Sequence, residues 1–598
     1  MKKIFLYHDR KAWLRKTGAH GERLSIDLDN FTFTVNAVNG PDAVEISLRG
    51  AADKERLEKE YTGLIAGLGG KNNTLYWWAG ALSEKNPFTS LLFTRIYKLA
   101  CFRAALEKKT GALEVVLFSE DKVLIRQIAA NGAEQYRAVS APDFYPCFFI
   151  KRLLTFLKGS LRVLKRSVTE YSNLSYARNN LRDKLSGVRH GKKLTVLCAA
   201  VDHRNYSSGK YRDPYFNRLP DFLSSRGENV MFLGRVHGNY RKSVDDIRRD
   251  PRNLIVPVNA FLRKTDILRC LAAAFFRRPS ARKGVILDGM KIDALIEAEL
   301  SADISSCDFF IAMTQYYACL RLGENADIKR FIYTFENYSW EKAGIMGLRV
   351  SSPGTLITGF QHAFISKNSF NYFPGGGEEK AMPFPDKIVT MGGRTAEIMR
   401  RFGNYPEGVI SPGCALRQEY LFSLPVLERA RRGAIFVPLT ITIADTVKVF
   451  RFLYNGGLGK GPDKVYFRFH PATPKDKVLS SLGFKLPENF IVSDNPPMIE
   501  EIKRCSVVLY TWTTVCLEAL RMGRPAVYID VNYPLEVDPL FECGHLTARC
   551  ARPEDLSGVI DRLRGMDEEM FRKEAVSAGK YLDEYFFPVN ENTMGAFL

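Results

Sequence analysis

The segment VVLYTWTTVCLEALRMGRPAVYID, from Val507 to Asp530, determines the fold class. It reads as a buried strand, a Thr-rich turn, a helix, a Gly-Arg-Pro break and a second strand, because short apolar runs flank a stretch of helical length. A strand, helix and strand in this order form the repeating unit of a parallel sheet. Thr511, Thr513 and Thr514 fall where the helix begins, so their hydroxyls and the free backbone amides form an anion site that suits a phosphate.

The same alternation of strands and helical stretches extends through most of the chain and predicts two parallel, doubly wound sheets. Strands of the first are expected at Leu194 to Ala200, Val230 to Gly234, Phe309 to Met313, Phe331 to Thr334 and Thr355 to Phe360, with a helix around Tyr215 to Ser225. Strands of the second are expected at Lys387 to Met391, Ala434 to Pro438, Lys464 to Phe469, Phe490 to Val492, Val507 to Tyr510 and Ala526 to Val531, before a last helix from about Met570 to Tyr585. The GGG run at 375–377 and the MPFPD patch after it are expected to form a linker.

Four regions follow from this pattern: an N-terminal α/β extension (1–143), a basic amphipathic helical segment (144–190), and two Rossmann-like domains (191–380 and 381–598). In the extension, strands are expected at Lys3 to Tyr7 and Leu113 to Phe118. Asp27 and Asp29 form a DxD triplet, which we expect at the surface of a hairpin. Ligands of doubly wound sheets bind at the carboxyl ends of the strands, so we expect the two large domains to face each other across a cleft.

Composition limits the classes of function. The 598 residues are 46% hydrophobic and 25% charged, which is the balance of a folded protein. The formal net charge of +20 favours polyanions or an anionic membrane surface as partners. No zinc finger, basic zipper or aromatic RNA-binding signature is present, so we expect no nucleic-acid partner. Eleven cysteines without a CxxC pair indicate a reducing cytoplasm, and no segment has the apolar length of a membrane span or a signal peptide.

A second motif, VYFRFHP at 465–471, places Arg468, His470 and Pro471 at the end of a predicted strand. This motif resembles the HP motif of bacterial sialyltransferases, of capsule enzymes that transfer Kdo, and of CDP-glycerol glycerophosphotransferases. The resemblance implies that the imidazole contacts the phosphate of a nucleotide donor. It also implies that the Thr-rich turn holds that phosphate and that Glu518, one turn down the following helix, hydrogen-bonds the ribose. A structural His at a strand end and an exposed helical Glu are the alternatives.

A third motif, FIYTFENYSWEKAG at 331–344, is followed by LITGFQHAF at 356–364. Both read as strands that end in polar residues. They resemble patterns of surface-carbohydrate biosynthesis proteins of the GT-B type, with Asn337, Trp340, Glu341 and Gln361 on the acceptor side. The resemblance covers the chain from about Thr195 onward.

The resemblance implies an α/β fold of the GT-B type and a glycosyltransferase that builds a bacterial surface polysaccharide. Glycosyl transfer needs a base for the acceptor hydroxyl, for which Glu336 and His362 are the candidates. Glu336 has a structural alternative as a cap of the helix that begins near Ser339. The HP motif favours a CMP-sugar such as CMP-Kdo or CMP-sialic acid, with UDP-sugars next, and implies inversion without a metal. We expect no cofactor beyond this nucleotide-sugar co-substrate. The alternatives are a CDP-glycerol-type polyol-phosphate transferase and a non-catalytic scaffold of a polysaccharide assembly complex.

Two basic segments with apolar residues, 144–185 and 261–283, predict contact with an anionic membrane surface. Their basic residues include Lys151, Arg152, Lys158, Arg162, Lys165 and Arg166, and their aromatic residues are Phe148, Phe149, Phe156, Phe275 and Phe276. The alternative is a pair of ordinary core helices with snorkelling basic side chains. We therefore expect a protein at the inner face of the plasma membrane, where a lipid-linked or growing saccharide is the acceptor.

Overall fold

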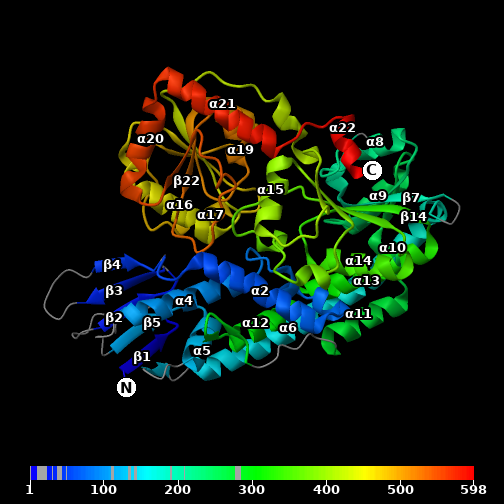
Figure 1. Ribbon diagram of the computed structural model, residues 1–598, viewed down its shortest axis with the longest axis horizontal. Helices are drawn as coiled ribbons and strands as arrows, with labels where there is room; N and C mark the ends of the chain where they lie inside the picture. Colours follow the sequence, from blue (N-terminus) through cyan, green and yellow to red (C-terminus); the bar gives the residue numbers. More distant parts are fainter. Residues whose placement is uncertain are drawn as a thin grey trace. The chain divides into compact units, whose positions relative to one another are not determined.

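The computed structural model describes residues 2–9, 23–29, 31–36, 44–48, 50–108, 114–131, 136–140, 144–188, 192–207, 209–276 and 284–598 (Figure 1). The chain forms two compact units. Unit 1 contains Met1–Gln361, Phe370–Val389 and Met399–Ser411, and unit 2 contains His362–Ser369, Thr390–Ile398 and Pro412–Leu598. The chain therefore passes from one unit to the other several times.

Unit 1 begins with a six-stranded mixed sheet in the order β4-β3-β2-β5-β1-β6. Its strands are β1 (Lys2–Tyr7), β2 (Arg23–Asp27), β3 (Thr32–Asn36), β4 (Val44–Ser47), β5 (Glu114–Phe118) and β6 (Tyr136–Ser140). The expected strands at β1 and β5 are confirmed, and β2 and β3 form the expected antiparallel hairpin. Asp27, however, is only 5% exposed, because its carboxylate turns inward and accepts a hydrogen bond from the Asp29 amide. The expectation of a surface position for Asp27 is wrong.

The second sheet of unit 1 has seven strands in the order β11-β10-β7-β14-β15-β16-β17. They are β7 (Leu194–Val201), β10 (Asn229–Val236), β11 (Leu254–Pro257), β14 (Ile328–Thr334), β15 (Leu356–Phe360), β16 (Lys387–Thr390) and β17 (Ile410–Pro412). The pairings from β11 through β16 are parallel. Numbered along the chain, the first five strands have the order 3-2-1-4-5 of a Rossmann sheet.

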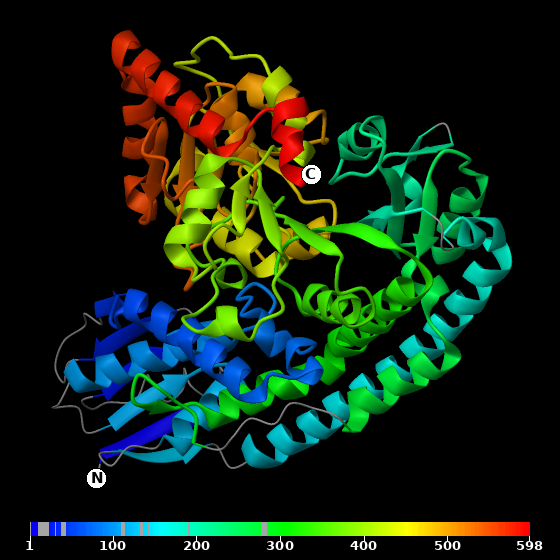
Figure 2. The ribbon, with the colours of Figure 1, turned by 45° about the vertical axis from the view of Figure 1, so that its right-hand side comes forward.

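Helices connect these strands and extend well beyond the sheets. In unit 1 they are α2 (Lys54–Asn72), α3 (Leu75–Trp78), α4 (Leu92–Lys108), α5 (Lys122–Ala130), α6 (Phe144–Asn180), α7 (Arg182–Ser186), α8 (Leu219–Ser225), α9 (Tyr240–Arg249), α10 (Val258–Phe261), α11 (Lys264–Phe276), α12 (Asp293–Ser306), α13 (Asp308–Asn325) and α14 (Ser339–Ser351). Helix α15 (Gly393–Phe402) crosses from unit 2 to unit 1. Figure 2 shows α6 as the longest of these helices, drawn in cyan.

Two expectations about unit 1 are wrong. The expected strand at Phe309 to Met313 is the first part of helix α13, which packs closely on α14. A Cβ atom on Gly347 of α14 would lie 2.3 Å from the carbonyl oxygen of Tyr316 on α13, so the two helices touch backbone to backbone. The strand at Lys387 does not open the second sheet, because β16 pairs with β15 of the first.

The GGG run is not an open linker. A Cβ atom on Gly375 would lie 2.4 Å from the carbonyl oxygen of Thr62, so this glycine packs directly on helix α2. The chain between β15 and β16 is therefore built into unit 1 at this point. Only a residue without a side chain fits against the α2 backbone there.

Unit 2 contains a six-stranded parallel sheet in the order β20-β19-β18-β21-β22-β23. Its strands are β18 (Ala434–Pro438), β19 (Val465–Arg468), β20 (Phe490–Val492), β21 (Cys505–Tyr510), β22 (Ala526–Ile529) and β23 (Thr547–Cys550). The order is again 3-2-1-4-5-6, so the predicted α/β class with two Rossmann-like parallel sheets and an N-terminal extension is confirmed. The five strands predicted from Ala434 onward and the helix predicted from about Met570 to Tyr585, which is α21 (Glu568–Tyr585), are also confirmed, although α21 is not the last helix.

Helices cover both faces of the second sheet, as alternation along its strands requires. Ile435 and Val437 face a core that includes side chains of α16 (Ile443–Asn455), α17 (Lys475–Ser480) and α20 (Leu556–Gly565). Phe436, on the opposite face, packs with α18 (Met498–Arg504) and α19 (Val515–Arg521). The short helix α22 (Glu591–Met594) follows α21.

The described ranges contain no helix with the length and apolar character that crossing a membrane requires. Within the same ranges, no three His, Cys, Asp or Glu side chains gather into a group that would hold a metal ion. The ten described cysteines are buried and free of disulfides.

Candidate functional site

Each Rossmann-like sheet has one position where the strand order reverses, and ligands of such folds bind beyond the carboxyl ends of the strands at that position. In unit 1 the reversal lies between β7 and β14, and in unit 2 it lies between β18 and β21. The ENYSWE motif directly follows β14, and the Thr-rich turn directly follows β21. Most of the predicted site residues therefore lie at the carboxyl ends of strands at or beside these two positions.

The HP motif of unit 2 forms a turn after β19, the strand next to β18. The His470 side chain is exposed, and its Nδ1 atom accepts a hydrogen bond from the Ala472 amide at 3.2 Å. Thr473 closes the turn: its amide donates to the His470 carbonyl at 2.8 Å, and its hydroxyl donates to the Ile441 carbonyl at 2.9 Å. The imidazole is thus held at the carboxyl edge of the sheet with Nε2 directed away from this backbone contact.

Arg468 is engaged with the protein rather than directed to a ligand. Its guanidinium donates to the Pro496 carbonyl at 2.6 Å and forms an ion pair with Glu501, which is only 5% exposed. Glu501 also accepts a hydrogen bond from the Ser493 hydroxyl. Arg468 therefore neutralises a buried carboxylate, and its predicted role with the donor phosphate remains a prediction.

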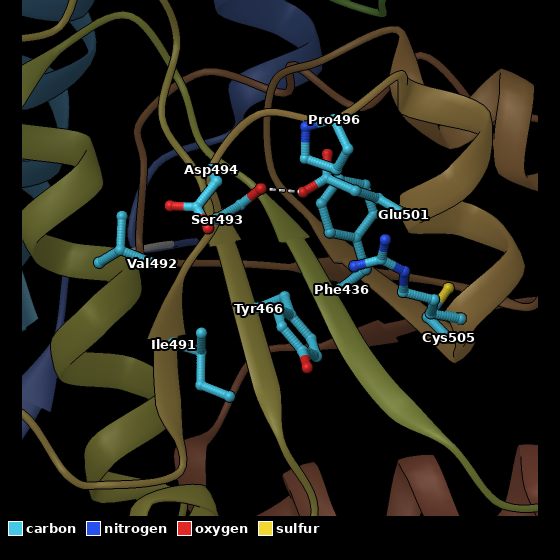
Figure 3. Close-up of a pocket in the computed structure, with 10 residues that line it drawn as sticks. Phe436, Tyr466, Ile491, Val492, Ser493, Asp494, Pro496, Glu501 and Cys505 are labelled. Carbon is cyan, nitrogen blue, oxygen red and sulfur yellow. Dashed lines mark hydrogen bonds between the residues drawn. The ribbon is translucent and has the colours of Figure 1, made fainter.

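Beside this ion pair lies a cavity of about 310 Å³ that no sequence motif indicated (Figure 3). It lies on the face of the second sheet that α18 covers. Tyr466 pairs in register with both Phe436 and Ile491, so these three side chains point to the same face. The cavity combines this apolar floor with the polar groups of Ser493, Asp494 and Glu501.

The Thr-rich turn joins β21 to α19. The Thr513 hydroxyl accepts a hydrogen bond from the Val515 amide at 3.3 Å, Thr514 is exposed, and Thr511 is buried. Glu518 lies on α19, and its carboxylate accepts a hydrogen bond from the Tyr420 hydroxyl at 2.9 Å. Burial raises the pKa of Glu518, while the Tyr420 hydroxyl and the Arg468 charge act against the rise. The sequence did not reveal Tyr420, because the segment that carries it is nearly a hundred positions earlier.

In unit 1, the turn after β14 is held by Glu341. Its carboxylate accepts hydrogen bonds from the Glu336 amide at 3.1 Å and from the Asn337 amide at 2.7 Å. Burial, and after it the charge of Glu336, raise the pKa of Glu341 well above its usual range. Asn337 has a left-handed backbone with φ at +60°, and its side chain donates to the Asn371 carbonyl at 2.7 Å. Glu341 and Asn337 thus fix the backbone that presents Glu336.

The segment around Trp77 and Trp78 supports the same turn. Glu84 accepts a hydrogen bond from the Ser339 amide at 2.8 Å, so the carboxylate that caps the first turn of α14 is that of Glu84. Lys342 of α14 donates to the Ser83 carbonyl at 2.7 Å. Burial lowers the pKa of Lys342 to about 7. The WWAGALSEK segment therefore anchors α14, and capping of Ser339 does not depend on Glu336.

Gln361 follows β15, next to β14 in the sheet, as the Phe335 amide donates to the Phe360 carbonyl at 2.7 Å. The two motifs of unit 1 are therefore neighbours, as the sequence predicts. Gln361 is buried, and its backbone N–H donates to the Val389 carbonyl at 2.9 Å. His362 begins the first segment of unit 2 and is also buried, and its carbonyl accepts a hydrogen bond from Gln418 at 3.2 Å.

One functional candidate in unit 1 was not predicted. Arg235 is the penultimate residue of β10, and its guanidinium lies 3.5 Å from the centroid of the Trp340 ring. Trp340 is in the first turn of α14, so a cation–π contact joins two of the segments at the carboxyl edge of the sheet. The one signal in the sequence was a charged residue in an otherwise apolar strand, VMFLGRV.

No protein-family model matches the chain, and no curated protein matches it. Solved structures similar to it include CalG4, the calicheamicin glycosyltransferase, at 14% identity and a TM-score of 0.36, covering 68% of this chain and 99% of that one. The glycosyltransferase SnogD from Streptomyces nogalater (15%, TM-score 0.38, 68% and 99%) and MurG from Acinetobacter baumannii (13%, TM-score 0.34, 68% and 98%) are also similar. So is a UDP-GlcNAc 2-epimerase from Methanocaldococcus jannaschii (9%, TM-score 0.36, 65% and 98%).

The assignment of the chain to the α/β class of the GT-B type rests on its two parallel sheets and their strand orders.

Proposed function

We propose that this chain is a glycosyltransferase that takes its sugar from a nucleotide-activated donor. The donor binds to unit 2 and the acceptor binds to unit 1. The observation that carries the proposal is the location of His470 beyond the carboxyl end of β19 and of Thr513, Thr514 and Glu518 beyond that of β21, the two strands that flank β18 in one Rossmann-like sheet. These groups offer an imidazole, two hydroxyls and a carboxylate, the groups that a sugar nucleotide's phosphate and ribose need.

In this proposal the nucleotide's phosphate lies between the HP turn and the Thr-rich turn. The nucleobase extends into the cavity that Tyr466 lines. The apolar floor of this cavity suits a planar ring, and its Ser493 and Asp494 groups suit the polar edge of the nucleobase. The HP motif favours a cytidine-activated sugar, with a uridine-activated sugar next. No step of this proposal is assigned to a metal ion.

The chemistry requires removal of a proton from the acceptor hydroxyl and stabilisation of the departing phosphate. We assign the first task to Glu336 and keep His362 as the second candidate. The second task falls to His470 and the hydroxyls of the Thr-rich turn. A single displacement of this kind inverts the configuration at the sugar's anomeric carbon.

A thermal-shift panel with CMP, CDP, UDP and GDP tests the proposal. A ligand present at about one hundred times its Kd stabilises the protein by roughly 2.7 kcal/mol, which raises the melting temperature measurably. Stabilisation by one nucleotide supports the donor site, and no stabilisation by any of them overturns it. The mass of the product then separates a glycosidic unit from the phosphodiester unit that a polyol-phosphate transferase would add. Unchanged cellular polysaccharide after His470→Ala and after Glu518→Ala would instead favour a scaffold.

We also propose that helix α6 docks unit 1 on an anionic membrane, where a lipid-linked saccharide is presented. The supporting observation is an exposed stripe on α6, spaced alternately by four and three residues, whose members are between 44% and 70% exposed: Ile150, Leu154, Leu157, Leu161, Leu164, Val168 and Tyr171. A buried face of the same helix, which includes Val163 and Leu174, packs on unit 1. The stripe is therefore not part of the core.

Charge favours a membrane over a second copy of the chain as the occupant of this stripe. No Asp or Glu occurs between residues 144 and 169, whereas Lys158, Arg162 and Lys165 are exposed beside the stripe. Two copies would bring these like charges together, but anionic headgroups attract them at about 1 kcal/mol per residue near the surface. The side chains of Phe148, Phe149, Lys151 and Arg152 lie outside the described residues.

Helix α11 continues this surface, because it packs beside α6 (Figure 2). Leu268 and Phe276 of α11 are 65% and 82% exposed, and Phe275 is half-buried. A surface that spans two helices matches a flat bilayer better than a single partner helix. The inner face of the plasma membrane is the location that fits a cytoplasmic sugar nucleotide and this surface together.

A further inference from the structure

Arg235 has unusual surroundings for an arginine in a strand. It follows Gly234 at the carboxyl end of β10, where its backbone pairs with Ala200 of β7. The guanidinium lies 3.5 Å from the centroid of the Trp340 ring. Within the part of the chain that the structure describes, this guanidinium takes part in no hydrogen bond. Its five N–H donors are therefore available at the carboxyl edge of the first Rossmann-like sheet.

Arg235 is half-buried, so solvent meets part of the guanidinium, and an anion that binds there would replace that solvent. Burial lowers the pKa of Arg235, while electrostatic interactions with Cys198, Glu341 and Glu336 act against that decrease. The guanidinium stays protonated all the same, because an arginine cannot lose its proton in a protein. The hydrogen bonds that the Glu341 carboxylate accepts come from the amides of Glu336 and Asn337 and not from this guanidinium.

The Trp340 ring also sets the direction of the free donors. A guanidinium that lies over an aromatic ring keeps its N–H groups in its own plane, pointing away from the contact. Such a planar array of donors matches a carboxylate or phosphate, which it binds through two parallel hydrogen bonds. Tyr215 of the loop before α8 lies close enough to affect Arg235 electrostatically, so this loop borders the same space. Asp213 fixes the loop by accepting the amides of Tyr215 at 2.8 Å and Phe216 at 2.7 Å.

We infer that Arg235, oriented by Trp340, binds an oxyanion of the acceptor. The acceptor class is therefore a saccharide that carries a carboxylate or a phosphate near the hydroxyl that reacts. This inference rests on the proposed function, because it names the substrate class of the acceptor side. Arg235, at the carboxyl end of β10, and Glu336, just after β14, lie at the same edge of the sheet, so the bound anion and the candidate base share that edge.

Binding of small probes tests the inference without a complete acceptor. Glucuronate supplies a carboxylate, glucose 6-phosphate supplies a phosphate, and glucose is the neutral control, with binding measured by ligand-observed NMR on the full-length protein. We expect one or both anionic probes to bind more tightly than glucose. Arg235→Gln should weaken that probe roughly tenfold to a hundredfold, as the loss of charge-assisted hydrogen bonds requires. Arg235→Lys should recover only part of the affinity, because an ammonium group lacks the planar fork.

Arg226→Gln is the matched control. Arg226 also lies over an aromatic ring, 5.3 Å from the centroid of Phe222, but at the amino end of β10. This variant should bind all three probes as the wild type does. Equal binding of glucose and both anions by the wild type, or equal loss in Arg226→Gln and Arg235→Gln, would overturn the inference.

Nucleotide stabilisation separates this inference from the proposed function. If the Arg235→Gln variant is still stabilised by the nucleotide but no longer binds the anionic probe, the result supports both the acceptor inference and the proposed function. A protein that is stabilised by a nucleotide but does not distinguish the probes overturns the acceptor class alone. If no nucleotide stabilises the protein but Arg235 still selects an anion, the anion site at Arg235 is supported and the nucleotide donor site in unit 2 is overturned.

Discussion

The Lys85 ammonium lies 2.7 Å from one carboxylate oxygen of Glu378 and 2.8 Å from the other, and neither side chain is exposed to solvent. Glu378 also accepts a hydrogen bond from the Gly375 amide at 2.8 Å. The pair thus joins the segment after the two tryptophans to the chain between β15 and β16, nearly three hundred positions later. Both segments belong to unit 1 and border the turn that presents Glu336.

Breaking this pair should destabilise unit 1 strongly. Lys85→Met leaves a buried, unpaired carboxylate, and such changes cost about 3–5 kcal/mol. The double change Lys85→Met with Glu378→Met should recover much of that loss, since neither member of the pair is then left without the other. Thermal unfolding of both variants measures the effect, with the exposed pair Lys503–Glu500 as control, where Lys503→Met should cost less than about 1 kcal/mol. A small effect of Lys85→Met would show that solvent reaches the site.

The donor assignment predicts a loss of nucleotide affinity without a loss of fold. His470→Ala removes an exposed side chain, and the double change Thr513→Ala with Thr514→Ala removes two hydroxyls. Each should weaken nucleotide binding by on the order of 1.5–3 kcal/mol, which calorimetry measures directly. Because Thr513 also caps the Val515 amide, melting temperatures without nucleotide should be recorded as well. Unchanged affinity in both variants would mean that the phosphate binds elsewhere.

Glu336→Gln distinguishes a base from a structural group. Glu84 caps the Ser339 amide and Glu341 holds the turn, so the variant should fold and bind nucleotide normally. If Glu336 is the base, the turnover rate should fall by about 10²–10⁴. A rate within a few-fold of the wild type would transfer the role to His362, for which His362→Asn is the corresponding variant.

The membrane proposal predicts salt-sensitive binding to anionic liposomes and none to neutral ones. Replacing Lys158, Arg162, Lys165 and Arg166 with Gln should reduce co-sedimentation, and replacing Leu157, Leu161 and Leu164 with Ser should reduce it further. The matched control replaces exposed apolar residues of unit 2, Val426, Met570 and Val576, with Ser. If the control variant loses as much liposome binding as the α6 variants, exposed apolar surface in general, and not the α6 stripe, causes the binding. If the α6 variants change the oligomeric state of the protein instead, a second copy covers the stripe.

Asp538 makes the stability of unit 2 depend on pH. Burial raises the pKa of Asp538 from its ordinary value of 3.8 to about 6, although the Tyr510 hydroxyl donates to it at 2.7 Å. Between pH 4 and 6 the folded state keeps a proton that the unfolded state has released. Stability should therefore fall as the pH rises through this window, by at most about 3 kcal/mol, and stay low above it.

Asp538→Asn tests this sign. The Oδ1 atom of Asn can still accept from the Tyr510 hydroxyl and the Leu540 amide, as Oδ1 of Asp538 does. The variant should match the wild type near pH 4 and exceed it above pH 6 in urea unfolding. Parallel pH profiles of the two proteins would contradict the raised pKa.

The sequence predicted the second Rossmann-like sheet well and the edges of the first poorly. The buried strands of the second sheet are short apolar runs between turn signals, which leave little doubt that they are strands. Phe309 to Met313 is such a run too, but it belongs to a helix buried on nearly every side, and periodicity does not distinguish that case from a strand. Strand β16 was assigned to the wrong sheet because nothing local shows that the chain after the GGG run packs back onto α2.

The candidate site was predictable only where its residues share a motif. His470 and Glu518 each stand next to a strand end with a recognisable pattern. Arg235 and Tyr420 do not, since each acquires its role from a partner far along the chain, Trp340 and Glu518. Glu341 and Asn337 belong to the motif after β14, and their hydrogen bonds show that they hold the turn, which no spacing in the sequence reveals.

The repeated passage of the chain between the two units has a consequence for its synthesis. Strand β17, at Ile410–Pro412, belongs to the first sheet, so unit 1 is incomplete until that strand has left the ribosome. Unit 2 begins earlier, at His362. The side chain of Asn368 nevertheless accepts a hydrogen bond from the backbone N–H of Glu536, a residue that is synthesised much later. Domains usually fold one after the other as they emerge. Here the folding periods of the two units overlap on the nascent chain, and neither unit exists as one continuous piece that could be excised and expressed alone.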